Sequence, residues 1–164
     1  MKIQYLGTAA AEGWPAVFCH CPACEEARRR GGRDIRTRSQ ALVNDDLLID
    51  FPPDTYWHSI AHGVDLSAIR CQLLTHSHMD HMFPQEFVLR GGCYAHDMRV
   101  NDLDIIGTQY TKNTFDKISS EEMESGIAAL QHWRIAEPYV TIESAGYRIT
   151  ALPAKHMLGK GAVN

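Results

Sequence analysis

Four side chains of the kinds that bind metal ions lie within six residues of one another, at His76, His78, Asp80 and His81. They follow Cys71–Thr75, a compact β-prone run that we expect to be a buried strand. Open α/β sheets carry their ligand sites at the carboxyl ends of strands. Because His76 and His78 are two residues apart, they leave an extended backbone on the same side and can share one ion. Asp80 and His81 begin the next turn and can reach a second ion.

Imidazole nitrogens and a carboxylate oxygen suit zinc, manganese or iron. Two such ions about 3.5 to 4 Å apart can hold a hydroxide and clamp the transition state of ester or phosphate cleavage. The alternative is that these residues satisfy one another and solvent in a polar loop, which is the usual fate of a lone histidine. Four ligand-type residues in six positions at a strand end favour metal binding.

A second cluster consists of Cys19, Cys21 and Cys24, which supply three thiolates, whereas a structural zinc needs four ligands. Cytosolic thiols are kept reduced, so cysteines this close together favour metal over disulfides. His20 lies between two of the candidates and points away from their shared side. We therefore expect the fourth ligand to come from a distant segment. Unliganded thiols are the alternative, but exposed free thiols are reactive and this spacing is typical of zinc knuckles.

The only basic run contains six of the eleven arginines, between Arg28 and Arg38. Arginine forks grip phosphate with two hydrogen bonds, which suits a phosphorylated substrate. A solvated helix end and turn explains the run equally well. No aromatic residue is interleaved with these arginines, so stacking on nucleic-acid bases is disfavoured.

The length of 164 residues suits one domain, and 45% hydrophobic with 22% charged residues is a globular composition. A net charge of −4 gives no general attraction to nucleic acid or to an anionic membrane. Met1–Gly7 reaches a glycine before an apolar leader can form, and no later apolar run approaches the roughly 18 residues of a membrane span. We therefore expect a single domain, residues 1–164, in the cytoplasm.

Alternating strands and helices predict a sheet-containing α/β fold that positions both clusters. The expected strands are Ile3–Leu6, Ser39–Val43, Leu47–Ile49, Cys71–Thr75, Leu103–Ile106, Tyr139–Ile142 and Tyr147–Leu152. The expected helices are Glu25–Arg30, Thr55–His62, Phe83–Arg90 and a segment from Ser119 to about Trp133.

The string His76-Ser77-His78-Met79-Asp80-His81 resembles the His-x-His-x-Asp-His signature of the metallo-β-lactamase fold superfamily. That superfamily also has an aspartate at the end of an earlier strand, matched by Asp50, and a later histidine in a loop after another strand, matched by His156. The resemblance implies an αββα sandwich of two similar halves. It also implies that His76, His78 and His156 hold one metal ion, with Asp80 and His81 on the other, and that Asp80 is catalytic.

In the same resemblance Asp50 orients a ligand histidine or a loop amide. A strand-end carboxylate that caps a turn is nearly as good an interpretation of Asp50. The cysteine cluster and the following Glu25–Arg28 resemble the branch of the superfamily that includes the carbon-phosphorus lyase accessory phosphodiesterase and, more loosely, the pyrroloquinoline quinone biosynthesis protein B. This branch implies a structural zinc whose remaining ligand is a histidine near the C-terminus of the domain.

These features predict a two-metal hydrolase that cleaves a small cyclic or nucleotide-like phosphodiester through a metal-bridged hydroxide. A lactone or thioester hydrolase of the same superfamily is the alternative within enzymes. A zinc-dependent nucleic-acid-binding module is the alternative outside them. The expected cofactors are two divalent ions (zinc, manganese or iron) and one structural zinc. The expected partner is a small phosphodiester rather than a membrane or nucleic acid, and a homodimer is allowed.

The second half of the superfamily fold normally supplies a bridging aspartate and a final histidine. After His156 only eight residues remain, and none is Asp, Glu, His or Cys. We therefore expect this chain to be the N-terminal half of the fold or somewhat more, C-terminally incomplete and poorly active by itself. Loss of the covering half should expose the apolar side chains of Leu73, Leu74 and Ile149, and this exposed surface should drive self-association.

Four further histidines lack a ligand motif, and we expect surface or packing roles for His58 and His62. His96 lies close enough downstream of the histidine string to border the site, and His132 has no assigned role. An active chain 1–164 would mean that the missing ligands come from these residues, such as His58, His96 or His132.

Overall fold

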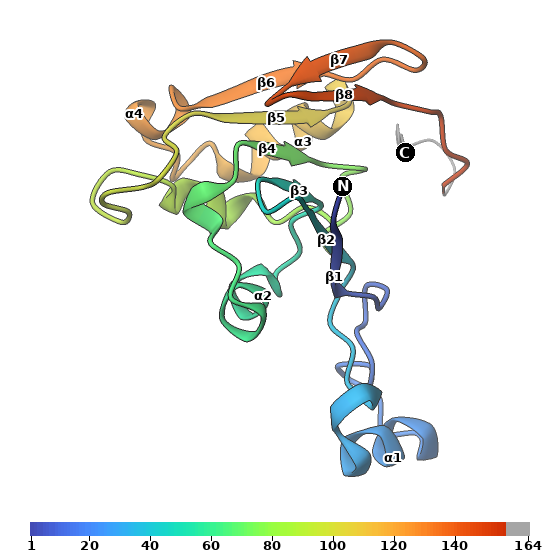
Figure 1. The fold of residues 1–164 in the computed structure, drawn as a ribbon. Helices are drawn as coiled ribbons and strands as arrows, with labels where there is room; N and C mark the ends of the chain where they lie inside the picture. Colours follow the sequence, from blue (N-terminus) through green and yellow to red (C-terminus); the bar gives the residue numbers. More distant parts are fainter. Residues whose placement is uncertain (157–164) are drawn as a thin grey trace.

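A mixed six-stranded sheet forms the centre of the protein (Figure 1), in a computed structural model that describes residues 1–156. Its strands, in both sheet order and chain order, are β1 (Ile3–Gly7), β2 (Gln40–Val43), β3 (Leu47–Ile49), β4 (Cys71–Leu73), β5 (Leu103–Gly107) and β6 (Gln131–Ile135). β2 pairs antiparallel with both β1 and β3, and β3 to β6 are parallel. This is the α/β arrangement that the sequence predicts.

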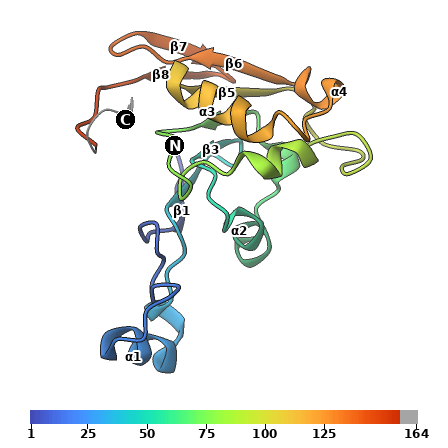
Figure 2. The same ribbon diagram turned by 180° about the vertical axis from the view of Figure 1, so that it is seen from behind.

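Helices and a hairpin cover the two faces of the sheet (Figures 1 and 2). The α-helices are α1 (Pro22–Arg30), α2 (Thr55–His62), α3 (Gln109–Ser119) and α4 (Ser125–Ala128). The 3₁₀ helices are η1 (Gly32–Asp34), η2 (Leu66–Ala68) and η3 (Pro84–Leu89). A separate antiparallel hairpin consists of β7 (Thr141–Ser144) and β8 (Tyr147–Thr150).

Side chains alternate between the two faces of the strands and build one core on each face. Leu48 and Ile105 point to the face covered by α3 and η3, whereas Leu47 and Ile106 point to the hairpin. The first core contains Leu6, Leu42, Leu48, Val64, Ile69, Leu74, Met82, Phe87, Leu103, Ile105 and Phe115. The second contains Val43, Leu47, Cys71, Ile106, Ala136 and Ala151, with partly buried residues of the hairpin packed on it.

The expected helix from Ser119 to Trp133 is wrong except for the short helix α4, Ser125–Ala128. Ser119 is instead the last residue of α3. This helix starts after Thr108, whose hydroxyl caps it by accepting a hydrogen bond from the backbone amide of Thr111. Residues 131–135 form β6, which pairs in parallel with all five residues of β5. The capping-type residues that follow Ser119 therefore belong to the turn between α3 and α4.

The expected exposure of three apolar residues is also wrong in part. Leu74 is only 1% exposed and belongs to the first core. Leu73 and Ile149 are half-buried and pack on the second core. The β7–β8 hairpin covers the face on which they lie, so that face carries less bare apolar surface than predicted.

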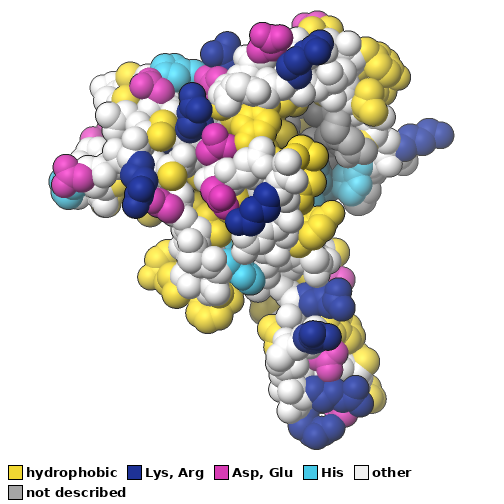
Figure 3. Space-filling model, viewed as in Figure 1, with side chains coloured by type: hydrophobic (Ala, Val, Ile, Leu, Met, Phe, Trp, Pro, Cys, Tyr) yellow, Lys and Arg dark blue, Asp and Glu magenta, His cyan; other side chains and the backbone are white. Residues whose placement is uncertain are grey.

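Residues 8–38, which we call the arm, project away from the sheet between β1 and β2 and carry α1 at their tip (Figures 1 and 3). The base of the arm is tied down by Arg38, whose guanidinium Nη1 lies 3.0 Å from Asp54 Oδ1 and whose backbone amide donates to Asp54 Oδ2 at 2.7 Å. Gly7 lets the two sides of the base approach, since a Cβ there would lie 2.0 Å from the carbonyl oxygen of Arg38.

A buried polar network joins α2 to the sheet. His58 is 1% exposed, and its ring nitrogens lie 2.5 Å from Gln40 Oε1 and 2.7 Å from Thr37 Oγ1. Burial lowers the pKa of His58 to about 4, with the charge of Asp54 opposing the shift and that of His62 adding to it. His58 therefore has a packing role, as the sequence predicts, and is neutral at pH 7.

This network should make stability fall in mild acid. The unfolded chain takes up a proton on His58 near its ordinary pKa of about 6.5, whereas the folded chain resists until about pH 4, so stability is lost as the pH falls between these values. Between pH 7.5 and 5.0 the wild-type protein should lose about 2 kcal/mol more unfolding free energy than His58→Gln. Urea unfolding at the two pH values measures this difference, and parallel losses in both proteins would contradict it.

No helix within residues 1–156 combines the length and apolar character needed to cross a membrane.

Candidate metal centre

The segment after β4 turns back on itself at the carboxyl ends of β3 and β4. The backbone amides of His81 and Met82 both donate to the carbonyl of His78, at 2.9 and 2.8 Å. Phe51, one residue beyond Asp50, fastens this turn to the end of β3, because its amide donates to the His81 carbonyl at 2.7 Å. The histidine string is thus held against the sheet edge where the sequence places it.

Three histidines converge there. His76, His78 and His156 each offer a ring nitrogen, and these atoms all lie within 4.8 Å of one another. His78 Nδ1 is 3.1 Å from His76 Nε2 and 3.3 Å from His156 Nε2. His156 reaches the group from beyond the β7–β8 hairpin, after Ala151, which pairs with Pro138. The structure therefore brings together the three residues that the resemblance implies for one metal ion.

The protonation of this group suits a metal ion. His76 is 8% exposed, and burial lowers its pKa to about 4, assisted by the charges of His81, His156 and His78. Its imidazole is therefore neutral at pH 7, which is the form that coordinates metal. Three imidazoles within reach of one point are a donor set for zinc, manganese or iron.

Asp50 and Asp80 flank the fourth histidine of the site. His81 Nδ1 lies 2.6 Å from Asp50 Oδ2, and His81 Nε2 lies 3.3 Å from Asp80 Oδ2. Burial opposes a charge on His81, but the hydrogen bond to Asp50 and the charges of both aspartates outweigh it and raise the pKa of His81. With Asp50 holding Nδ1, Nε2 faces the carboxylate of Asp80, and these two side chains offer one nitrogen and one oxygen ligand to a second ion.

Asp50 is itself fixed by an unusual backbone and by Thr75. Its φ of 61° is in the left-handed region, which Asp tolerates better than most residues. Its Oδ1 accepts from the Thr75 amide at 2.9 Å and from the Thr75 hydroxyl at 2.8 Å. On the other side, Gln40 Nε2 donates to the Asp50 carbonyl at 2.9 Å. The Asp50 carboxylate thus joins the end of β3 to Thr75, the residue directly before His76.

Sequence reasoning missed Thr75 and Gln40. Thr75 carries no motif of its own, because its hydroxyl matters only through Asp50. Gln40 gave one usable signal in the sequence, since it is a polar residue that begins an otherwise apolar strand. In the structure its side chain is only 2% exposed. Of the remaining histidines, His132 bonds Asp102 at 2.7 Å, and neither it nor His96 belongs to a metal-type group among the described residues.

The three cysteines form a second group on the arm. Cys19, Cys21 and Cys24 place their Sγ atoms within 4.8 Å of one another, and Cys24 is buried at the first turn of α1. The Cys24 amide donates to the Cys21 thiolate, and hydrogen bonds from the Cys19 and Cys24 thiols add to this, so the pKa of Cys21 falls to about 7. A thiolate that forms near neutral pH is the ligand that zinc requires.

Neighbouring side chains hold the cysteine loop but do not complete the site. Arg28 binds the carbonyls of Cys19 and Ala16 at 2.7 and 2.9 Å and so braces the loop against α1. His20 Nδ1 pairs with Glu25 Oε1 at 2.7 Å, in an exposed position. Within residues 1–156 no fourth ligand joins the three thiols.

Most arginines of the basic run, Arg28–Arg38, bind other groups of the protein. Arg29 and Arg30 both bind Glu26, with Nη2 and Nε at 2.5 and 2.7 Å from its Oε1, and Arg38 binds Asp54. The run lies on the arm (Figure 3), away from the histidines at the sheet edge. These contacts favour the solvated helix end over a phosphate-binding cluster.

Replacing Cys21 with serine should remove about one equivalent of zinc from the protein, because two thiols alone do not close a tetrahedral site. The histidine site should keep its metal, since sulfur ligands select zinc independently of nitrogen and oxygen ligands. Metal analysis after mild chelation measures both. Cys93→Ser, which alters an exposed cysteine outside the group, is the matched control. Unchanged zinc content in Cys21→Ser would refute the structural-zinc assignment.

Comparison with curated proteins gives partial matches. No protein-family model matches the chain. An octanoyltransferase of Porphyromonas gingivalis is 36% identical over 86 residues, which are 50% of this chain and 16% of that protein. A coenzyme PQQ synthesis protein B of Methylobacterium radiotolerans is 34% identical over 95 residues, 50% of this chain and 31% of that protein. The matched segments are therefore about a sixth and a third of those relatives.

Solved structures match almost the whole chain. A diphosphatase of the PhnP family superposes with a TM-score of 0.75 and 19% identity, covering 98% of this chain and 60% of that one. Zn²⁺-bound PqqB of Methylobacterium extorquens superposes with a TM-score of 0.69 and 23% identity, covering 92% and 55%. The chain has the metallo-β-lactamase fold. It spans rather more than half the length of these two structures, as the sequence resemblance implies.

The metallo-β-lactamase fold explains how the site is assembled from distant segments. Its strand ends carry Asp50 after β3 and the histidine string after β4, and the segment beyond the β7–β8 hairpin adds His156. Identity in the solved relatives is below 25%, so the residues of this chain, rather than the fold, decide what the site can do.

Proposed function

We propose that the protein is a metal-dependent hydrolase that cleaves a small phosphodiester of a cyclic or nucleotide-like kind. The observation that carries the proposal is the convergence of three imidazole nitrogens within 4.8 Å, beside an aspartate and a fourth histidine, at the carboxyl edge of the sheet. A pair of divalent ions bound there supplies positive charge against the phosphate oxygens and an activated water.

The residues of the chain would hold and orient that pair. His76, His78 and His156 are the ligands assigned to one ion, and Asp80 and His81 are those assigned to the other. Asp50 keeps the His81 ring in place through Nδ1, at 2.6 Å, so that Nε2 remains directed at the site. Because Asp50 already holds the His81 ring, that side chain needs little reorientation when substrate binds.

The choice of a phosphodiester rests on relatives and on the donor set. The structural neighbour with the higher TM-score of the two is called a diphosphatase. Hard oxygen and imidazole ligands suit ions that bind phosphate oxygens. The arm would contribute a structural zinc at its cysteines rather than a phosphate-binding cluster, because four of its six arginines already bind carboxylates or carbonyls, at Arg28, Arg29, Arg30 and Arg38.

A substrate panel tests the proposal. The purified protein, loaded separately with zinc and manganese, is assayed with bis(p-nitrophenyl) phosphate, a cyclic nucleotide and a lactone. We expect turnover of at least one phosphodiester and little turnover of the lactone. Activity on the lactone alone would defeat the phosphodiesterase assignment while leaving a hydrolase in place. A salt-sensitive gel shift that survives alanine at His76 and His78 would instead support a nucleic-acid-binding module.

A further inference from the structure

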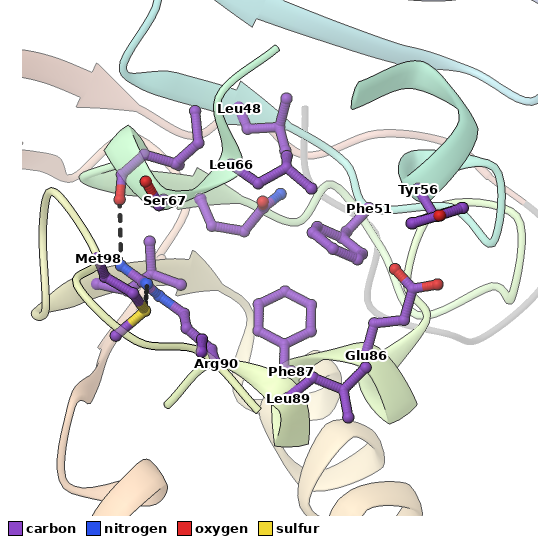
Figure 4. Close-up of a pocket in the computed structure, with 14 residues that line it drawn as sticks. Leu48, Phe51, Tyr56, Leu66, Ser67, Glu86, Phe87, Leu89, Arg90 and Met98 are labelled. Atoms are coloured by element: carbon purple, nitrogen blue, oxygen red, sulfur yellow. Dashed lines mark hydrogen bonds between the residues drawn. The ribbon is translucent and has the colours of Figure 1, made fainter. Parts of the chain in front are cut away.

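Helix α2 lines two hollows that differ in chemistry. The first is lined mainly by apolar side chains and has Arg90 at one end (Figure 4). The Arg90 guanidinium is already in use, because Nη1 binds Met98 Sδ and Nη2 binds two backbone carbonyls. This hollow therefore gives an anion nothing to bind.

The second hollow lies between α2, the end of β1 and the base of the arm (Figure 1), and its volume is about 530 Å³. Its walls come from residues 5–8, from residues 32, 33 and 35–37 of the arm, and from three residues of α2. None of these residues belongs to the histidine or cysteine groups. A dry cavity of about 150 Å³ binds benzene, so by proportion this hollow accommodates about twenty non-hydrogen atoms.

Two arginines of the arm that bind no acid line this second hollow. Within residues 1–156 no ion pair includes Arg33 or Arg36, whereas the other four arginines of the basic run bind carboxylates or carbonyls. The Arg36 Nη1 atom is 3.5 Å from Thr8 Oγ1, and its other donors are free. No Asp or Glu lines the hollow, and Asp34, the acid between the two arginines, lies outside its lining. Two like charges in one hollow without an acid favour an anion between them.

Exposed apolar side chains gather around the same hollow. Tyr5 is 73% exposed, Trp57 is 58% exposed and Ile35 is 47% exposed, and all three line it. A single exposed apolar residue is ordinary, but two aromatic rings that share a hollow with two free arginines indicate a ligand with an aromatic part.

We infer that this hollow binds a phosphate monoester that carries an aromatic ring and has about the size of a nucleoside monophosphate. Such a phosphate has a charge of about −1.5 to −2 at pH 7, which matches the two guanidinium groups of Arg33 and Arg36. Its terminal oxygens accept the paired hydrogen bonds that an arginine fork donates. The ring would lie against Trp57 and Tyr5, since every base has a face that can stack on an aromatic side chain.

Three probes test the inference by titration calorimetry on the purified protein, with no metal added. They are adenosine 5′-monophosphate, adenosine, which lacks the phosphate, and inorganic phosphate, which lacks the ring. We expect the monophosphate to bind at least about tenfold more tightly than either fragment, and its affinity to fall as salt is raised. No binding of the monophosphate, or binding no tighter than that of one of the fragments, would overturn the inference.

Variants place the monophosphate in this hollow. The double change Arg33→Gln with Arg36→Gln should weaken its binding about tenfold or more, and leave adenosine binding unchanged. Trp57→Ala should weaken it about fivefold or more through loss of stacking. Tyr56→Ala is the matched control, because Tyr56 is an exposed aromatic residue of the same helix that lines the other hollow. Equal losses in Trp57→Ala and Tyr56→Ala would contradict the placement of the ring.

Two further variants separate this site from general charge effects and from the metal centre. Arg99→Gln removes an exposed arginine that pairs with Asp65, and it should leave binding unchanged. His78→Ala should also leave it unchanged. If His78→Ala abolishes binding and the double arginine variant does not, the monophosphate sits at the metal centre and the inference is wrong.

The altered side chains of Arg33, Arg36 and Trp57 are exposed, so we expect these variants to fold, and circular dichroism checks this. If one does not fold, the comparison of the three probes on the wild-type protein still decides for or against the site. The readout is binding rather than turnover. Failure here therefore leaves the proposed hydrolase untouched, and failure of the hydrolase leaves this site untouched.

Discussion

Replacing His78 with alanine should lower the rate of phosphodiester hydrolysis by about a thousandfold or more. His78 lies between His76 and His156, with Nδ1 within 3.3 Å of a nitrogen of each, so its removal takes away the middle member of a three-nitrogen set. Bound metal stabilises transition-state charge by several kcal/mol, and each 1.36 kcal/mol is a factor of about ten in rate. Steady-state assays and metal analysis on the same samples measure the two losses together.

The control for this change is His132→Ala, which removes an exposed histidine that pairs with Asp102 at the surface. It should keep both metal content and rate. The zinc that we propose for the cysteine group should also remain in His78→Ala, since that group lies on the arm. A His78→Ala protein that retains full metal and full activity would show that the converging imidazoles are not the working site.

Replacing Asp50 with asparagine should weaken metal binding at the histidine site by about ten- to a hundredfold. Asparagine keeps an acceptor for Thr75 and tolerates the φ of 61°, but it places an amide where His81 Nδ1 needs a carboxylate. The ring then loses the partner that directs Nε2 into the site. Competition with a coloured chelator measures the affinity, and activity at limiting metal should fall in step.

A matched control exists in Asp45, another aspartate with positive φ, at 71°, but on the surface beside Lys2. Asp45→Asn should leave metal affinity unchanged. Asp50→Ala should in addition lower the unfolding free energy by about 2 kcal/mol, because it leaves the part-buried donors of Thr75 and His81 without their acceptor. Equal metal affinity in Asp50→Asn and wild type would reduce Asp50 to a turn cap.

Local signals in the sequence predict much of the first half of the fold. The Asn44-Asp45-Asp46 turn correctly marks the hairpin of β2 and β3, since Asn44 and Asp45 adopt positive φ as turn residues do. The predicted helix Thr55–His62 is confirmed as α2, which is followed by Gly63 in a left-handed conformation. The error after Ser119 has a physical cause. The Gln131–Ile135 segment becomes a strand through pairing with β5, a tertiary contact that no local pattern reveals.

The site divides in the same way between near and distant contacts. His76 to His81 follow from spacing alone, because their order along a strand end fixes which side chains meet. His156 is 78 residues beyond His78 and could be named only through a family resemblance. Thr75 carries no sequence signal, since its role lies in the hydrogen bonds of its amide and hydroxyl to Asp50. Gln40 shows only as a polar residue at the start of an apolar strand, and the sequence does not reveal its contact with the Asp50 carbonyl.

The coincidence of strand order with chain order has a consequence for synthesis on the ribosome. Each new strand of the sheet adds beside the one made just before it, and none has to insert between two strands already paired. Every pairing in the sheet therefore joins strands that are consecutive in the chain, which lets the sheet grow from its N-terminal edge as the chain is made. His76 and His78 come to the edge once β4 and β5 have docked, while His156 is still to be made. We expect pulse-labelled nascent chains released after β6 to resist proteolysis over β1 to β5, with the last imidazole of the metal centre arriving on a finished scaffold.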